Sequence, residues 1–191
     1  MAALRRPGKS WSSKYTSFYF LVQSRIAPAM RDRNNVAIAG LRIAVGILFL
    51  IFGEYKVFGT AFTLGGGFQF WINRFLADGA YPFMIPVLRN FVLPHGTAIA
   101  FLVAYGEFAI GVALIFGVLV RPASVFGLIY MISLLFSSNY PGPGAPFWQY
   151  FGASLDHLVP ALCFATFIFG DAERVFSLRS HLGSVLGKQK T

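Results

Sequence analysis

Long apolar runs separated by polar or proline-rich stretches dominate the hydropathy pattern of this chain. Four of them cover residues 36–58, 97–120, 122–138 and 151–169. About twenty apolar residues, each rising 1.5 Å, suffice to cross the roughly 30 Å hydrocarbon core of a bilayer. The pattern therefore predicts an all-α integral membrane protein, with a bundle of four transmembrane helices within residues 36–170.

The second run contains a single charge, Glu107, near its middle, and is closed by Arg121 and Pro122. A charged side chain at the centre of a span costs about 2.5–3.5 kcal/mol on insertion scales. We therefore expect Glu107 to face a helix interface or a polar cavity, about 15 Å below the start of its helix. The other helices should pack around that face.

The first run contains Arg42 one to two turns inside its start. A long basic side chain at this depth is expected to snorkel toward the lipid headgroups. The same run contains small residues that would let a neighbouring helix approach closely. These are Gly40, Gly46 and Gly53.

Residues 60–96 form a long connection in which aromatic and polar side chains alternate without a clean span. Residues 65–67 are three consecutive glycines, and Pro82 and Pro86 interrupt any continuous helix. We expect two short amphipathic pieces that lie in the outer interface or dip into the membrane as a re-entrant lid. Connections this long in small membrane proteins are often functional.

Composition supports the membrane class. The 191 residues are 56% apolar and only 12% charged, unlike a soluble domain. The net charge of +9 could indicate nucleic acid, but the basic residues lie toward the chain ends and flank apolar runs. This distribution favours membrane lipids as partners and argues against nucleic acid.

The basic residues also predict the topology. Residues 1–35 are a basic segment, either a short interfacial helix or a disordered tail, and residues 171–191 are a short polar tail. With four spans, both ends and the Arg121 turn share one side, which holds twelve Lys and Arg against three on the other. The positive-inside rule places both termini in the cytoplasm, in an inner (cytoplasmic) membrane.

Polar residues of separate spans are expected to converge beneath the outer connection. Buried acids need partners, and a functional site is the default interpretation of them. His157 suits a proton relay, because its ordinary pKa lies near neutrality. The candidates are Glu107, Asp156 and His157 in catalytic, proton-coupled roles, with Glu54, Arg74 and Trp71 as cofactor contacts.

A quinone fits this chemistry, since its carbonyls need hydrogen bonds and a proton route while its tail needs an apolar groove. The alternative is a structural role, in which Glu107 only hydrogen-bonds to a neighbouring helix and the Asp156–His157 pair only caps its helix near water. Arg74 and Arg89 of the connection are the expected counter-ions.

Other chemistries are poorly supported. The single Cys163, in an apolar run, excludes an internal disulfide and a CxxC site, and is expected to be a packing residue. No nucleotide-binding loop or metal-ligand motif occurs. Of His95, His157 and His181 only His157 lies clearly within a span, which argues against haem.

Three segments resemble the DoxX/DoxD family of membrane proteins. LRIAVGILFLIFGEYKVFG is similar to the opening of that family, and YGEFAIGVALIFGVLVRPAS to its second-helix motif, with Glu107 followed by spaced glycines and Arg121-Pro122. ASLDHLVPAL resembles the Asp-His start of its last helix. The likeness covers roughly residues 36–170, and it implies a four-helix bundle.

The resemblance also implies a function, because DoxD-like members are the small membrane subunit of thiosulfate:quinone oxidoreductase. We therefore expect a membrane subunit of a respiratory oxidoreductase that presents a quinone site, with partner subunits that bind the electron donor. The alternative is a non-catalytic subunit that anchors a larger membrane complex. A small-solute transporter is less favoured, because four spans without an internal repeat are a poor frame for alternating access.

Overall fold

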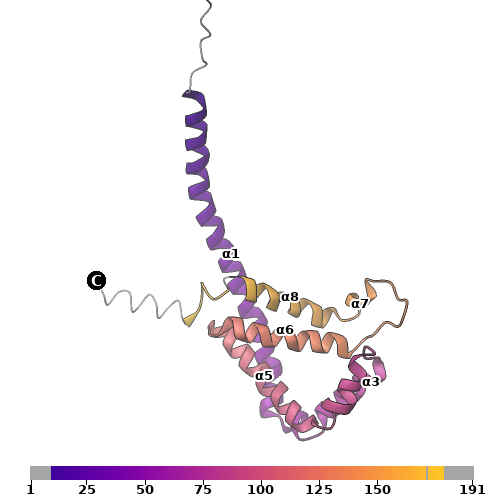
Figure 1. Ribbon diagram of the computed structural model, residues 1–191. Coiled ribbons are helices and arrows are strands. Elements are labelled where there is room, and N and C mark those ends of the chain that lie inside the picture. The colour runs from indigo at the N-terminus through magenta and orange to yellow at the C-terminus, as the bar shows by residue number, and fades with distance from the viewer. Residues whose placement is uncertain (1–9, 171, 179–191) are drawn as a thin grey trace, which may run out of the picture.

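The computed structural model describes residues 10–170 and 172–178, and no strand occurs in this part of the chain. Figure 1 shows the arrangement of the helices. In chain order they are α1 Ser10–Phe58, α2 Thr60–Thr63, α3 Gly67–Asp78, α4 Met84–Val87, the π-helix η1 Leu88–Val92, α5 Gly96–Phe116, α6 Val120–Ser137, α7 Gln149–Gly152 and α8 Leu155–Phe169.

Three helical segments are long and apolar enough to cross a membrane, which confirms the all-helical, multi-pass class. They are Arg33–Phe58 of α1, α5 and α6, with 26, 21 and 18 residues. The α5–α6 turn passes through Gly117, whose φ of 66° is left-handed and whose N–H bonds to Ala113 O. Pro122 lies in the first turn of α6, where its missing N–H costs no hydrogen bond.

The fourth apolar run is interrupted, so the single helix expected over residues 151–169 is wrong in its boundaries. Ser154 has a non-helical backbone between α7 and α8, and its Oγ accepts a hydrogen bond from Asn139 Nδ2 at 3.0 Å. α8 begins at Leu155 and has 15 residues. At 1.5 Å per residue α8 is about 22 Å long, shorter than the hydrocarbon core.

The α1 helix is continuous from Ser10 to Phe58, and its 49 residues rise about 74 Å. Its first half projects beyond the other helices (Figure 1). Residues 10–35 therefore belong to one long helix rather than to a separate short helix or a disordered tail. Residues 1–9 and 179–191, which complete the two predicted terminal segments, lie outside the described residues.

The helices associate mainly as two pairs, α1 with α5 and α6 with α8, and α5 joins the pairs through α6. Glycines set the α1–α5 distance: a Cβ at Gly46 would lie 2.9 Å from Leu114 Cβ, and one at Gly53 would lie 2.6 Å from Phe108 Cα. Both glycines thus serve the close approach predicted for them. Gly40 does not, because a Cβ there would meet nothing within 4 Å.

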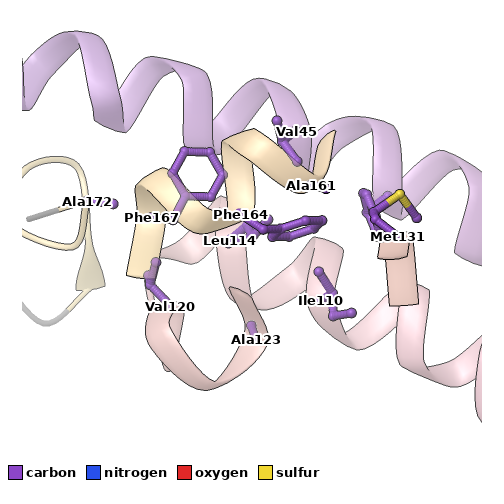
Figure 2. Close-up of a cluster of buried hydrophobic side chains, with 11 residues drawn as sticks. Val45, Ile110, Leu114, Val120, Ala123, Met131, Ala161, Phe164, Phe167 and Ala172 are labelled. Carbon is purple, nitrogen blue, oxygen red and sulfur yellow. The ribbon is translucent and has the colours of Figure 1, made fainter. Parts of the chain in front are cut away.

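Two apolar clusters fill the bundle. In the central core, Phe164 of α8 lies beside Leu114 of α5, and Phe167 points toward α1 (Figure 2). Its full membership is Val45, Phe49, Ile110, Leu114, Val120, Ala123, Met131, Ala161, Phe164, Phe167 and Ala172. The loop core lies at the other end of α5 and consists of Phe62, Phe68, Ile72, Ala80, Leu88, Ala100 and Ala104.

The outer connection contains the two helical pieces expected there, preceded by the four-residue helix α2. The first is α3, which buries Phe68 and Ile72, and the second runs through α4 and η1 from Met84 to Val92. Irregular backbone over residues 79–83, around Pro82, separates them. Their location in the membrane interface stays a prediction.

Candidate functional site

Glu107 lies on the buried face of α5, at the boundary between the two cores. Ala104 and Ala100, one and two turns before it, belong to the loop core, and Leu114, two turns after it, belongs to the central core. All share one face, because residues three, four and seven apart align on a helix. Glu107 is only 6% exposed, so its carboxylate faces the helix interface as the sequence predicts.

The counter-ion of Glu107 is Lys56, from the last turn of α1. Lys56 Nζ lies 2.7 Å from Oε1 and 2.6 Å from Oε2 of the carboxylate. Gly53, one turn earlier, brings the backbone of α1 against α5 at Phe108 and so sets this distance. The Lys56 side chain is 18% exposed and that of Glu107 is 7% exposed, so the ion pair is mostly buried. Lys56 also lies 4.9 Å above the centroid of the Phe62 ring.

A third polar group comes from α6. Tyr130 donates a hydrogen bond from its hydroxyl to Glu107 Oε1 at 2.6 Å. Charge-assisted hydrogen bonds of this length are among the stronger contacts in proteins. Lys56, Glu107 and Tyr130, which we call the triad, thus join three helices through one carboxylate.

The triad is neutral as a whole and combines donors with a proton acceptor. Removing either charge would strand the other away from water, and breaking a buried pair costs about 3–5 kcal/mol. An ammonium and a phenol can hydrogen-bond to a carbonyl oxygen, and a carboxylate can take up a proton. The arrangement can therefore bind an uncharged polar head group and exchange protons with it.

Arg42 forms a second polar contact, and its predicted snorkelling to the headgroups is wrong. It is 0% exposed, and its Nη1 and Nη2 donate to Ala172 O at 2.8 Å and Phe176 O at 2.6 Å. Gly117 makes room, because a Cβ there would lie 2.7 Å from Nη1. The guanidinium therefore anchors residues 172–178 to the bundle.

The structure does not bring Asp156 and His157 to the triad. Both lie in the first turn of α8, where the Asp156 side chain is 70% exposed. His157 Nδ1 lies 3.2 Å from Asp156 Oδ1, a contact without hydrogen-bond geometry, and this nitrogen has no hydrogen-bond partner among the described residues. The described contacts of Glu107 come from α1 and α6 rather than from α8.

The three predicted cofactor contacts also lie outside the triad. Glu54 is exposed, and so is Trp71 on the outer face of α3. Arg74 pairs with Asp78 of its own helix at 2.7 Å, with 60% of its side chain exposed, and Arg89 is exposed as well. The expectation that Arg74 or Arg89 neutralises the buried acids is therefore wrong for Glu107.

Sequence reasoning missed Lys56 and Tyr130 as site residues. A signal for Lys56 was present, because Arg42, Phe49 and Lys56 recur every seven residues and so share one helix face with Gly46 and Gly53. A face that combines glycines with charges indicates a helix interface. For Tyr130 no comparable signal exists, since it is one aromatic residue in an apolar run.

The described residues contain no group of three or more His, Cys, Asp or Glu side chains placed to hold a metal ion. The triad is a mostly buried set of acidic, basic and phenolic groups that three of the described helices bring together.

Comparison with known proteins places the chain in a family. Residues 37–139, more than half of the sequence, match the DoxX family model. The match covers the membrane part of α1, the outer connection, α5 and α6, and hence the whole triad; it ends before Asp156 and His157. No curated protein and no solved structure matches the chain. With its three apolar helices of spanning length, the chain is a multi-pass membrane protein that belongs to the DoxX family.

Proposed function

We propose that this protein is the membrane subunit of a quinone-linked respiratory oxidoreductase, of the thiosulfate:quinone type, and that the triad is its quinone-interacting site. The observation that carries the proposal is a buried carboxylate held by an ammonium and a phenol between three helices. Such groups are costly in a membrane and usually mark a pathway for substrate or protons.

The chemistry of the triad fits a quinone head group. In this proposal Lys56 and Tyr130, which both donate hydrogen bonds to Glu107, donate to the carbonyl oxygens of the quinone, and Glu107 delivers protons. Reduction of a quinone to a quinol adds two electrons and two protons. The protons pass through Glu107, and the electrons come from a donor bound by a partner subunit.

The membrane setting belongs to the same proposal. The chain lies in the inner (cytoplasmic) membrane with four crossings, the fourth by α8, and both termini are cytoplasmic. The basic residues near the chain ends support this orientation. Lipid surrounds the bundle, and nucleic acid is no partner.

Turnover of the native complex tests the proposal. The complex is extracted gently from membranes, its partners are identified by mass spectrometry, and quinone reduction is measured for Glu107→Gln and Tyr130→Phe. We expect Glu107→Gln to lower turnover at least tenfold, because general acid–base groups contribute about 10²–10⁴-fold.

Tyr105→Phe is the matched control for Tyr130→Phe. Tyr105 is 55% exposed and lies on α5 two residues before Glu107. The control should keep full turnover and full assembly. Unchanged turnover of Glu107→Gln in an intact complex would refute the role of the triad.

A non-catalytic anchoring subunit is the second candidate, favoured by a different observation. Lys56 and Tyr130 already provide hydrogen-bond donors to the Glu107 carboxylate, which is what a purely structural contact between helices requires. Exposed apolar faces are also available to other subunits or lipid; on α1 and α6 they include Leu41, Ile47, Leu48, Ile51, Phe52, Val125, Phe126, Ile129 and Ile132. An isolated chain that is stable, monomeric and quinone-bound would contradict this alternative.

A further inference from the structure

One side of the triad is covered by Phe62 of α2. An ammonium has three N–H donors, and two of the short contacts of Lys56 go to the oxygens of Glu107. The Phe62 ring, 4.9 Å from Nζ, takes part in a cation–π contact with the same ammonium. An aromatic ring therefore occupies a place where a hydrogen-bond acceptor could bind Lys56.

Phe62 belongs to a larger cover over the triad, which we call the cap and define as residues 60–78, from the start of α2 to the end of α3. Phe62 contacts Phe68 edge-to-face at 5.8 Å, and both belong to the loop core with Ala104, one turn before Glu107. The other side of the cap is aromatic and exposed, with Phe70 63% and Trp71 51% accessible. Phe62 thus lies between Lys56 and α3, whose other side carries exposed aromatic rings typical of the lipid headgroup region.

Glycines flank α3, and Phe62, which lies before them in α2, is linked to α3 through its ring contact with Phe68. Gly66 precedes α3 with a φ of 81°, and Gly79 follows it with a φ of 102°. Both φ values are left-handed, a conformation that glycine adopts at little cost. At the seam with α5, the Gln69 side chain packs on Gly96, and its buried Oε1 has no hydrogen-bond partner among the described residues.

We propose that the cap is the gate of the triad, and that an amphiphile with a hydrogen-bond-accepting head group enters from the membrane interface by displacing Phe62. The head group then takes the place of the ring beside Lys56, and its apolar tail lies along the loop core. This inference rests on the proposed function and adds the route and the class of ligand.

A reversible disulfide staple between α3 and α5 tests the gate. A Cβ at Gly96 would lie 3.2 Å from Gln69 Cγ, the atom that the sulfur of a cysteine at position 69 would replace, so cysteines at the two positions are near enough for a disulfide to be attempted. The variant is Gln69→Cys/Gly96→Cys in a Cys163→Ser background. The single-cysteine variants serve as controls for the substitutions themselves.

The probe is decylubiquinone, added to the full chain in nanodiscs, and the readout is the rate of tryptophan quenching in a stopped-flow instrument. The signal of a Lys56→Met/Glu107→Gln variant is subtracted, because it reports partition into lipid alone. We expect the oxidised staple to slow binding at least tenfold, and a reductant to restore the rate. Equal rates in both redox states would overturn the gate.

Removal of the Phe62 ring provides a second test, which needs no disulfide. Phe62→Ala removes the ring beside Lys56 and should speed binding severalfold, whereas Phe58→Ala, at a ring that is 72% exposed, should not. Equal rates for the two variants would contradict the role of Phe62. If the wild type itself binds no probe beyond the lipid signal, the proposed function fails, and the gate fails with it.

Discussion

At the scale of single residues, the short contacts between Lys56 and Glu107 make the stability of the bundle depend on both charges at once. Lys56→Met should leave an unpaired carboxylate and Glu107→Gln an unpaired ammonium. Each single change is expected to cost about 3–5 kcal/mol, since breaking a buried pair leaves an uncompensated charge. The double variant should be more stable than either single variant, because no charge then remains buried.

Unfolding of the four proteins in mild detergent gives this double-mutant cycle. Tyr105→Phe on the same helix controls for substitution in α5. Additive losses in the double variant would mean that the two side chains do not form a pair in the membrane.

Arg42 gives a second prediction at this scale. Arg42→Met leaves Ala172 O and Phe176 O without their donors, which costs about 1–3 kcal/mol for each buried group. Residues 172–178 should then detach and become open to trypsin at Arg174. Arg42→Lys keeps the positive charge but lacks the planar guanidinium group that donates to two carbonyls. Its cleavage at Arg174 should therefore lie between that of the wild type and that of Arg42→Met.

Limited proteolysis followed by mass spectrometry measures the cleavage at Arg174. The exposed Arg89 supplies the control, since Arg89→Met should leave that cleavage unchanged. Protection of Arg174 in Arg42→Met equal to that of the wild type would show that Arg42 does not anchor the segment.

At the scale of elements, the close contact between α1 and α5 depends on glycine. Gly53→Ala places a Cβ 2.6 Å from Phe108 Cα, so the helices must separate, and the triad with them. Overpacking of this kind costs about 1–3 kcal/mol. Gly40→Ala on the same helix, where a Cβ meets nothing within 4 Å, should be neutral or slightly stabilising.

Thermal unfolding of both glycine variants and the wild type makes the comparison. Equal losses of stability at Gly53 and Gly40 would contradict the α1–α5 packing described here.

The elements also show what sequence reasoning can reach. Hydropathy was enough for Arg33–Phe58 of α1, for α5 and for α6, because a span must be apolar along its whole length, but it did not predict that α1 begins at Ser10. It failed at Ser154, where a side-chain contact with Asn139 interrupts an apolar run. Hydropathy also did not predict the pairing of Lys56 with Glu107, because an ion pair between two helices depends on how they pack and not on the hydropathy pattern of either helix alone.

At the scale of the whole molecule, the crossing of the short α8 decides the topology. Single cysteines in a Cys163→Ser background, at Ala2→Cys, Ala77→Cys and Thr191→Cys, can be labelled with a membrane-impermeant maleimide from either side. We expect positions 2 and 191 to react from the cytoplasmic side and position 77, in α3, from the other. Reaction of position 191 together with position 77 would mean that α8 does not cross.

The central claim is that the triad binds a quinone, and photolabelling tests it most directly. The wild type in nanodiscs is illuminated with an azidoquinone, and the labelled peptides are mapped by mass spectrometry. We predict label around Lys56, Phe62 and Tyr130, lost in Lys56→Met/Glu107→Gln. Label spread over the exposed faces of α1 and α6, and unchanged in that variant, would contradict the claim.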